Sequence, residues 1–202
     1  MAHYFDKNPE VKSNKKDIKF NFLGAEIYFR TDNGVFSKDS VDEGTRIFLD
    51  VIVPLKLQGN VLDLGCGYGA LGLTLAYFNK DLRVLCADVN ARAVELCQEN
   101  AKKLQLHDRV DCLISDRYEN IGETFDYIVI NPPIRAGKAI TYSMYEGALD
   151  HLKENGSMFI VIRKAQGAAS ALEYLESIFS SVSVLEKHHG YWIIQAVKNN
   201  EK

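Results

Sequence analysis

The sequence predicts an α/β fold: a seven-stranded, mostly parallel sheet with an antiparallel last strand, helices on both faces and a β-hairpin before the sheet. From residue 60 onward, short apolar strand-like runs alternate with amphipathic helical runs, the pattern of a parallel sheet covered on both faces. The last two strand-like runs are separated only by HHG, which is too short for a crossover and predicts an antiparallel last strand.

The N-terminal part of the chain predicts a hairpin, a loop and a helix. Residues 17–30 alternate apolar and polar side chains on both sides of Leu23-Gly24, which predicts a β-hairpin. The loop TDNGVFSKDS follows and is rich in turn residues. Ser40 and Glu43 then form a predicted capping box for a helix that ends at Pro54.

The remaining elements alternate regularly. Strands are predicted at 60–64, 82–88, 109–114, 125–130, 157–163, 182–187 and 191–197. Helices are predicted between them at about 69–78, 90–104, 138–153 and 166–179, where apolar residues recur at helical spacing. Asn155-Gly156 predicts the C-terminal stop of the third of these helices.

Composition excludes several classes of protein. The 202 residues, 47% hydrophobic and 25% charged, are enough for one globular domain with a substantial core. No apolar run is long enough for a membrane helix, and the polar N-terminus does not resemble a signal peptide, so we expect a cytoplasmic protein with no membrane partner. Four widely spaced cysteines without a CxxC pair predict neither a metal site nor a disulfide framework, and Cys86 and Cys97 are expected to pack in the core.

The stretch NVLDLGCGYGALGL, residues 60–73, combines a strand, a glycine-rich turn and a helix start. Gly65, Gly67 and Gly69 allow a tight turn and a close approach of the backbone to a ligand. Gly65, Gly67 and Ala70 also fit the dinucleotide fingerprint, so the glycines alone leave an NAD-binding oxidoreductase open.

Asp63 indicates whether the glycine turn binds a pyrophosphate, as in NAD, or a cationic ligand. No Lys or Arg lies between residues 57 and 79, so the carboxylate near the glycine turn would repel a pyrophosphate. S-adenosylmethionine carries an ammonium and a sulfonium beside its adenosine ribose, and an acidic loop attracts it. The sequence therefore predicts S-adenosylmethionine as the cofactor.

Acidic residues stand at the ends of three successive predicted strands, on the edge where open α/β sheets bind ligands. We expect Asp63 at the methionine end of the cofactor, Asp88 at the ribose and Asp116 at the adenine amino group. The rest of the predicted cofactor site is Phe36, Cys66, Val89, Arg117 and Asn131, together with the three glycines.

The motifs VLDLGCGYG, ADVN, SD and NPPI, in this order, resemble those of the class I S-adenosylmethionine-dependent methyltransferases, whose Rossmann-like sheet has seven strands with an antiparallel last strand. More narrowly, TDNGVFSKDSVDEGTRIFL, NPPIRAGK and RKAQGAASALEYLE resemble the small-subunit ribosomal RNA guanine-N2 methyltransferases of the C type. This resemblance begins near residue 17 and implies methyl transfer to guanine N2 of 16S ribosomal RNA, with that RNA or the small ribosomal subunit as partner and no metal. Two departures stand out: the chain has no room for the extra N-terminal domain of the larger members, and Ile134 replaces an aromatic residue found in many of them.

Asn131, Pro132, Pro133 and Ile134 are the predicted catalytic residues, because they follow the fourth predicted strand of the sheet. The lone pair of a purine amine is delocalised into the ring, so the amine is a poor nucleophile. The Asn131 side-chain oxygen and the Pro132 carbonyl can accept its two hydrogens and stabilise the developing positive charge. The prolines fix the backbone that aims these groups, and Ile134 can pack on the base.

Two further predictions concern the substrate and the cover of the site. Lys38, Arg135 and Lys138 are expected to contact RNA phosphates, although the net charge of −3 excludes a global basic field. Phe36 in the GVFS loop is expected to close over the cofactor. We therefore expect an N-terminal extension over 1–39, with the hairpin and this covering loop, and a methyltransferase domain over 40–202.

The sequence alone does not identify the group that accepts the methyl. NPP motifs also occur in enzymes that methylate adenine N6 in nucleic acid or a glutamine amide in release factors, because all these groups are planar NH₂ groups. An NAD-binding oxidoreductase and a non-catalytic binding module of the same fold are the other interpretations, and the sequence does not indicate an oligomeric state.

Overall fold

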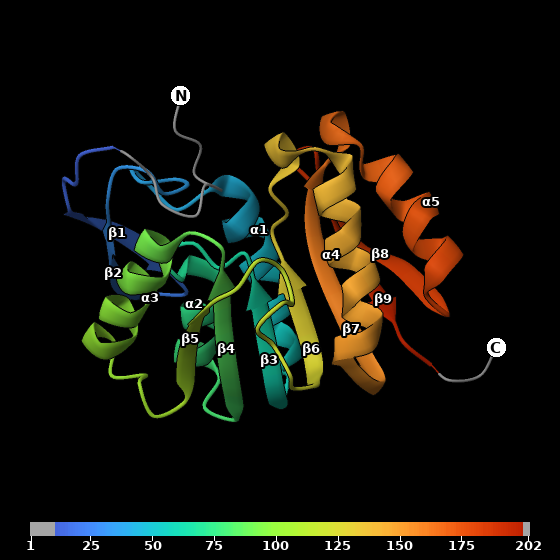
Figure 1. Ribbon diagram of the computed structural model, residues 1–202, viewed down its shortest axis with the longest axis horizontal. Helices are drawn as coiled ribbons and strands as arrows, with labels where there is room; N and C mark the ends of the chain where they lie inside the picture. The colour runs from blue at the N-terminus through green and yellow to red at the C-terminus, as the bar shows by residue number, and fades with distance from the viewer. Residues whose placement is uncertain (1–10, 200–202) are drawn as a thin grey trace.

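The computed structural model describes residues 11–199 and contains one large sheet and one separate hairpin (Figure 1). The sheet has the strand order β5-β4-β3-β6-β7-β9-β8. Its strands are β3 (Gly59–Leu64), β4 (Leu82–Asp88), β5 (Val110–Ile114), β6 (Phe125–Ile130), β7 (Leu152–Arg163), β8 (Ser181–His188) and β9 (Tyr191–Val197). The N-terminal residues 1–10, which contributed to the prediction about targeting, lie outside the described part.

Five helices accompany the sheet in the described part of the chain: α1 (Glu43–Ile52), α2 (Ala70–Phe78), α3 (Ala91–Lys103), α4 (Lys138–His151) and α5 (Ala168–Ile178). Short 3₁₀ turns follow α1 (Val53–Leu55) and precede α4 and α5 (Ile134–Ala136 and Lys164–Gln166). Strands β3 to β7 pair in parallel, whereas β9 lies between β7 and β8 and runs antiparallel to both. The predicted fold class is confirmed.

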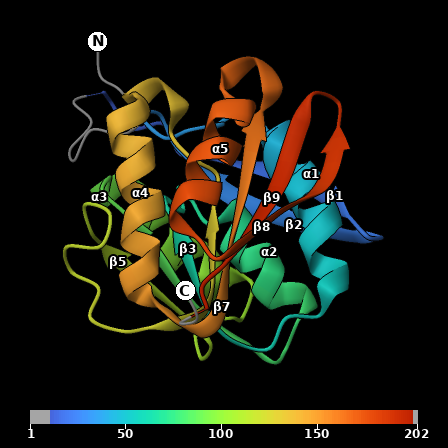
Figure 2. The same ribbon diagram turned by 90° about the vertical axis from the view of Figure 1, so that its right-hand side faces the viewer.

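Alternate residues along each central strand face two separate apolar cores. Val61 and Val129 pack into the core with α1, α2 and α3, whereas their neighbours Leu62 and Ile128 pack into the core with α4 and α5. Figure 2 shows α4 and α5 side by side on one face of the sheet. Burial on both faces explains why these strands are almost continuously apolar.

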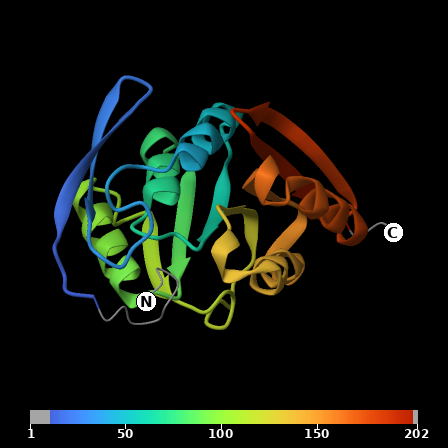
Figure 3. The same ribbon diagram turned by 90° about the horizontal axis from the view of Figure 1, so that it is seen from above.

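The hairpin of β1 (Lys16–Phe22) and β2 (Ala25–Thr31) packs on the first of these cores, near α3. Figure 3 shows it at one end of the molecule, opposite the β8–β9 pair. Its inward face is formed by phenylalanines and isoleucines at alternate positions. The buried side chain of Asn100 fastens it, since its amide donates to the carbonyls of Arg30 and Tyr68 and its oxygen accepts the N–H of Arg30. Asn100 thereby links the hairpin to the glycine turn that contains Tyr68.

Two local predictions are wrong. The N-cap of α1 is Asp42 and not Ser40: its carboxylate accepts the N–H of Thr45, so the predicted capping box does not form. Helix α4 ends at His151, and Asn155-Gly156 lie inside β7, where Asn155 has φ of 60°. A Cβ at residue 156 would lie 2.9 Å from the carbonyl oxygen of Lys153, so glycine is needed there for close backbone packing in the strand.

No helix within residues 11–199 is both long and apolar enough to cross a lipid bilayer.

Candidate active site

A cavity of about 430 Å³ opens at the carboxyl ends of β3, β4 and β6, where the sequence predicts the site. The predicted residues that line it are Phe36, Asp63, Gly65, Cys66, Gly67, Asp88, Val89, Asp116, Arg117, Asn131, Pro132 and Pro133. Gly69, Lys38, Ile134, Arg135 and Lys138 do not line it. Residues that the sequence reasoning missed include Asp42, Thr45, Tyr68, Ile140 and Met144.

The glycine turn after β3 forms one wall of the cavity. Gly65, Gly67 and Gly69 have φ of 79°, 57° and 95°, in the left-handed region that favours glycine. A Cβ at residue 67 would meet no atom within 4 Å, so the backbone there faces open space. Its N–H donates to Oδ2 of Asp88 at 2.8 Å, which ties the turn to the end of β4.

Gly69 has a packing role instead, because it begins α2 at the bottom of the turn. A Cβ there would lie 2.6 Å from Cδ1 of Leu73 and 2.7 Å from Sγ of Cys97. We expect Gly69→Ala to lower the free energy of unfolding by about 2–4 kcal/mol, the sum of backbone strain and overpacking. Urea titration followed by circular dichroism measures this change.

Gly122→Ala is the matched control for that substitution. Gly122 has no left-handed φ, and a Cβ there would meet nothing within 4 Å. Its unfolding midpoint should stay within error of the unsubstituted protein. Equal midpoints for the two variants would contradict the assignment of Gly69 to a strained, crowded position.

Two buried carboxylates lie behind the turn. Asp63 is 1% exposed, and among residues 11–199 its one hydrogen-bond donor is the N–H of Gly72, at 2.8 Å. Burial raises the pKa of Asp63 to about 7, which the Gly72 bond opposes and the nearby Asp88 reinforces. Burial also raises the pKa of Asp88, although its two oxygens accept the N–H groups of Gly67 and Asn90.

Four carboxyl groups line the cavity, those of Asp42, Asp63, Asp88 and Asp116. Asp42, Asp63 and Asp88 line it, and within residues 11–199 none of the three forms an ion pair with Lys or Arg. Only Asp116 has a cationic partner, Arg117, whose Nε lies 3.0 Å from Oδ1. These carboxyl groups fit a cationic ligand that also carries hydroxyl groups, such as S-adenosylmethionine. They disfavour a pyrophosphate, which they would repel.

Asn131 follows β6 and is held by the N-terminus of α1. Its Nδ2 donates to Oδ2 of Asp42 at 3.2 Å and to Oγ1 of Thr45 at 3.0 Å. A carboxylate can only accept, so this pair determines which end of the amide is the NH₂ group. The side-chain oxygen of Asn131 has no donor among the residues described and remains available to accept one.

The residues after Asn131 make the turn that precedes α4. The Pro132 carbonyl accepts the N–H of Ile134 at 2.9 Å, and its second lone pair remains. Ile134 packs against the core of α4 and α5 instead of lining the cavity. Apolar side chains that do reach the cavity nearby are those of Phe36 and Ile140, which are 41% and 39% exposed.

The GVFS loop contributes Phe36 and Ser37 to the lining of the cavity and is hydrogen-bonded to neighbouring elements. The hydroxyl of Tyr68 in the glycine turn donates to the Ser37 carbonyl at 3.2 Å. The buried Asn90, at the N-terminus of α3, donates to the Gly34 carbonyl at 2.9 Å. The loop is therefore in contact with the ends of both β3 and β4.

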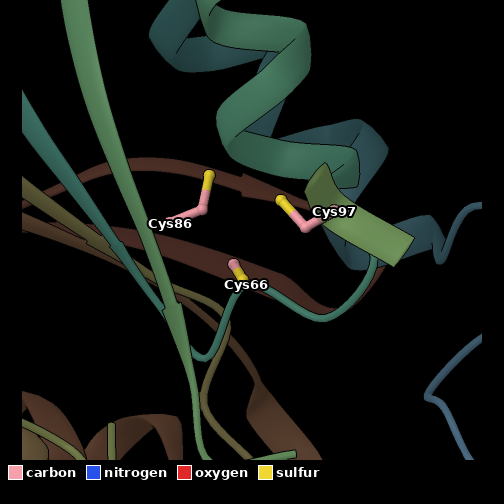
Figure 4. A group of neighbouring side chains, drawn as sticks. All are labelled: Cys66, Cys86 and Cys97. Atoms are coloured by element: carbon pink, nitrogen blue, oxygen red, sulfur yellow. The ribbon is translucent and has the colours of Figure 1, made fainter. Parts of the chain in front are cut away.

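Three thiols converge under the turn. Cys66, Cys86 and Cys97 come from the turn, β4 and α3, and their sulfurs all lie within 4.8 Å of one another (Figure 4). All three are buried in the core, which confirms the predicted packing of Cys86 and Cys97. A hydrogen bond with Cys86 raises the pKa of Cys66, and one with Cys112 raises the pKa of Cys97.

A family model described as the methyltransferase small domain matches residues 26–195. The chain belongs to this family. The prediction that it is an S-adenosylmethionine-dependent methyltransferase is thereby confirmed, and an NAD-binding oxidoreductase is excluded.

One similar protein has nearly the length of this chain, and two others are about twice as long. The Bacillus subtilis (strain 168) protein YbxB is 45% identical over 198 residues, covering 97% of this chain and 98% of YbxB. Ribosomal RNA small subunit methyltransferase C of Vibrio cholerae is 34% identical over 190 residues, covering 91% of this chain but 53% of that protein. The solved T. thermophilus 16S rRNA N2 G1207 methyltransferase, in complex with AdoMet and guanosine, has a TM-score of 0.83 at 28% identity and is covered to 52%. The chain thus spans about half the length of the latter two.

Proposed function

We propose that this methyltransferase transfers a methyl group to the N2 amine of guanine in small-subunit (16S) ribosomal RNA, in the cytoplasm. The observation that carries the proposal is Asn131, which lines the cavity: two hydrogen bonds hold its NH₂ group, and its amide oxygen has no donor within residues 11–199. The printed names of the Vibrio cholerae and T. thermophilus proteins, which specify small-subunit ribosomal RNA, support this acceptor.

The acidic strand ends would hold the methyl donor. Asp63 would face the methionine end, Asp88 the ribose hydroxyls, and Asp116 with Arg117 the adenine, while the backbone at Gly67 lies alongside. Bound there, S-adenosylmethionine supplies a methyl group that is already activated by a sulfonium. The Asp63 and Asp88 carboxylates would be held ionised by this cation, against the burial that raises the pKa of each.

Asn131 and Pro132 would act on the acceptor amine. Their oxygens accept its two hydrogens, which favours a tetrahedral nitrogen with an available lone pair. As the new N–C bond forms, the bond between the methyl carbon and the sulfonium sulfur breaks, and S-adenosylhomocysteine leaves as a neutral thioether. Positive charge develops on the nitrogen, and both oxygens would stabilise it. The extra proton then leaves to solvent, because a methylated arylammonium is strongly acidic, and no basic side chain is needed.

Basic side chains outside the cavity are candidates for phosphate contacts. Arg135 and Lys138 are exposed beside Pro133, and neither forms an ion pair within the described chain. Lys38 donates to Oδ1 of Asn33 and so also holds the loop at the mouth. We propose that these three groups position RNA, which predicts that raised salt weakens RNA methylation while cofactor affinity stays constant.

Incubation with radiolabelled S-adenosylmethionine and separate acceptors tests the proposed function. The acceptors are unmethylated small subunits, naked 16S RNA, DNA and a release factor, and the labelled product is hydrolysed to nucleosides. We expect label in small subunits or 16S RNA, as N2-methylguanosine. Label found only in protein, or in N6-methyladenine, would establish one of the alternative acceptors instead.

A further inference from the structure

Asp42 lies in the wall of the cavity and is held in one orientation. It is the N-cap of α1, and its Oδ2 accepts the N–H of Thr45 at 3.1 Å and Nδ2 of Asn131 at 3.2 Å. Nδ2 of Asn131 also donates to Oγ1 of Thr45. Three residues from two distant segments of the chain therefore form one hydrogen-bonded unit beside the reacting position.

The other oxygen of Asp42 has no donor. No hydrogen bond to Oδ1 and no ion pair with Asp42 occur within residues 11–199, although the residue is half-buried and lines the cavity. Because Asp42 lines the cavity, a base bound there can donate a hydrogen to this oxygen in place of water.

The edges of the purines differ at the atom next to the amine. Guanine carries an N1–H donor beside its N2 amine, so a carboxylate next to the amine acceptors can accept that hydrogen in a charge-assisted bond. In 2-aminopurine and adenine, N1 is an unprotonated acceptor and would face the carboxylate oxygen. A site built to accept a hydrogen rejects an analogue that lacks it, because a buried polar group is left unpaired.

We propose that Asp42 is the residue that selects guanine: Oδ2 fixes the Asn131 amide, and Oδ1 accepts the N1–H of the base. This inference rests on the proposed function, because it requires a guanine amine at Asn131.

Binding of free nucleosides to the protein saturated with S-adenosylhomocysteine tests the proposal. Calorimetry with guanosine and with 2-aminopurine riboside, which keeps the N2 amine but lacks N1–H, yields a ratio of affinities. We expect the protein to prefer guanosine by about 10²-fold, the range of a charge-assisted hydrogen bond. In Asp42→Asn, the amide oxygen still caps α1 and the NH₂ group replaces Oδ1, so the preference should fall to about 1 or reverse.

Asp50→Asn is the matched control, since Asp50 is an exposed residue of the same helix outside the cavity, and its ratio should be unchanged. A structural role for Asp42 alone would weaken both nucleosides equally and leave the ratio intact, which would overturn the proposal. So would a protein that binds the two nucleosides equally, or binds no guanosine at millimolar concentration. If small subunits are still methylated at guanine N2 in those cases, the proposed function stands and only the role of Asp42 fails.

Discussion

Asn131→Ala is expected to lower the rate of methyl transfer by about 10³-fold while the dissociation constant of S-adenosylmethionine changes less than about threefold. In the proposed mechanism the Asn131 oxygen stabilises the charge that develops on the amine, so its loss would raise the barrier to transfer. Asp63 and Asp88, which we propose to bind the cofactor, lie at the ends of β3 and β4 and are left in place. Single-turnover kinetics with saturating donor, together with calorimetric titration of the donor, separates the two quantities.

The controls for this substitution address folding and position. Alanine also releases Asp42 and Thr45 at the start of α1, so thermal unfolding must show that the variant remains folded. Asn21→Ala, at an exposed position of the hairpin, should transfer methyl groups at the unsubstituted rate. An Asn131→Ala enzyme with normal turnover would remove Asn131 from the reaction.

Asp63→Asn is expected to weaken binding of S-adenosylmethionine by about 30-fold at pH 7.5, because the cationic donor loses a buried counter-charge worth about 2 kcal/mol. The same change should make the cofactor-free protein more stable at pH 8. Asn cannot ionise, while its side-chain oxygen still accepts the N–H of Gly72. Its buried NH₂ group would be left without an acceptor, which offsets part of this gain. We therefore expect Tm to rise by roughly 5 °C.

The pH dependence follows from the raised pKa of Asp63, about 7 in the fold against 3.8 when exposed. Between these values the folded protein binds more protons than the unfolded chain, so its stability falls as pH rises. The advantage of Asn in the cofactor-free protein should therefore be small at pH 5 and grow toward pH 8. Thermal scans of both proteins from pH 5 to pH 8 measure it.

The affinity for S-adenosylmethionine should show the opposite dependence on pH and increase as pH rises. Since the cation favours ionised Asp63, the affinity of the unsubstituted protein should fall as pH is lowered from 7 to 5.5, and this slope should be shallower in Asp63→Asn. Residual slope is expected from Asp88, whose pKa burial also raises. Parallel slopes in the two proteins would show that Asp63 does not ionise on binding.

Apart from the start of β7, the strands of the sheet could be predicted to within a residue or two, because each has a strong local signal. Residues 82–88, 125–130 and 191–197 match β4, β6 and β9 exactly as the structure bounds them. The start of β7 could not be predicted, because Asn155-Gly156 has the composition of a helix stop. Its function is a close backbone contact inside a strand, and such a contact is not visible in local sequence.

The same reasoning explains the gaps in the predicted site. Glycines and aspartates at strand ends are visible in sequence because topology alone brings them to one edge. Asp42 and Thr45 reach Asn131 across separations of 89 and 86 residues, so nothing local shows the pairing. The sequence signal for Asp42 is its place three residues before Thr45 at the start of a helix, which is typical of an N-cap. Ser40 offered an alternative N-cap, so this signal was not decisive.

The position of β9 has a consequence for how the protein is made. Because Tyr191–Val197 lie between β7 and β8, β7 is paired only with β6 and β8 lacks its partner in the sheet until the ribosome has synthesised this segment. During translation the nascent polypeptide therefore exposes the unpaired backbone N–H and C=O groups along one edge of the long strand β7, and such an edge can pair with other chains. Pairing of β9 with both β7 and β8 covers this edge and completes the seven-stranded sheet.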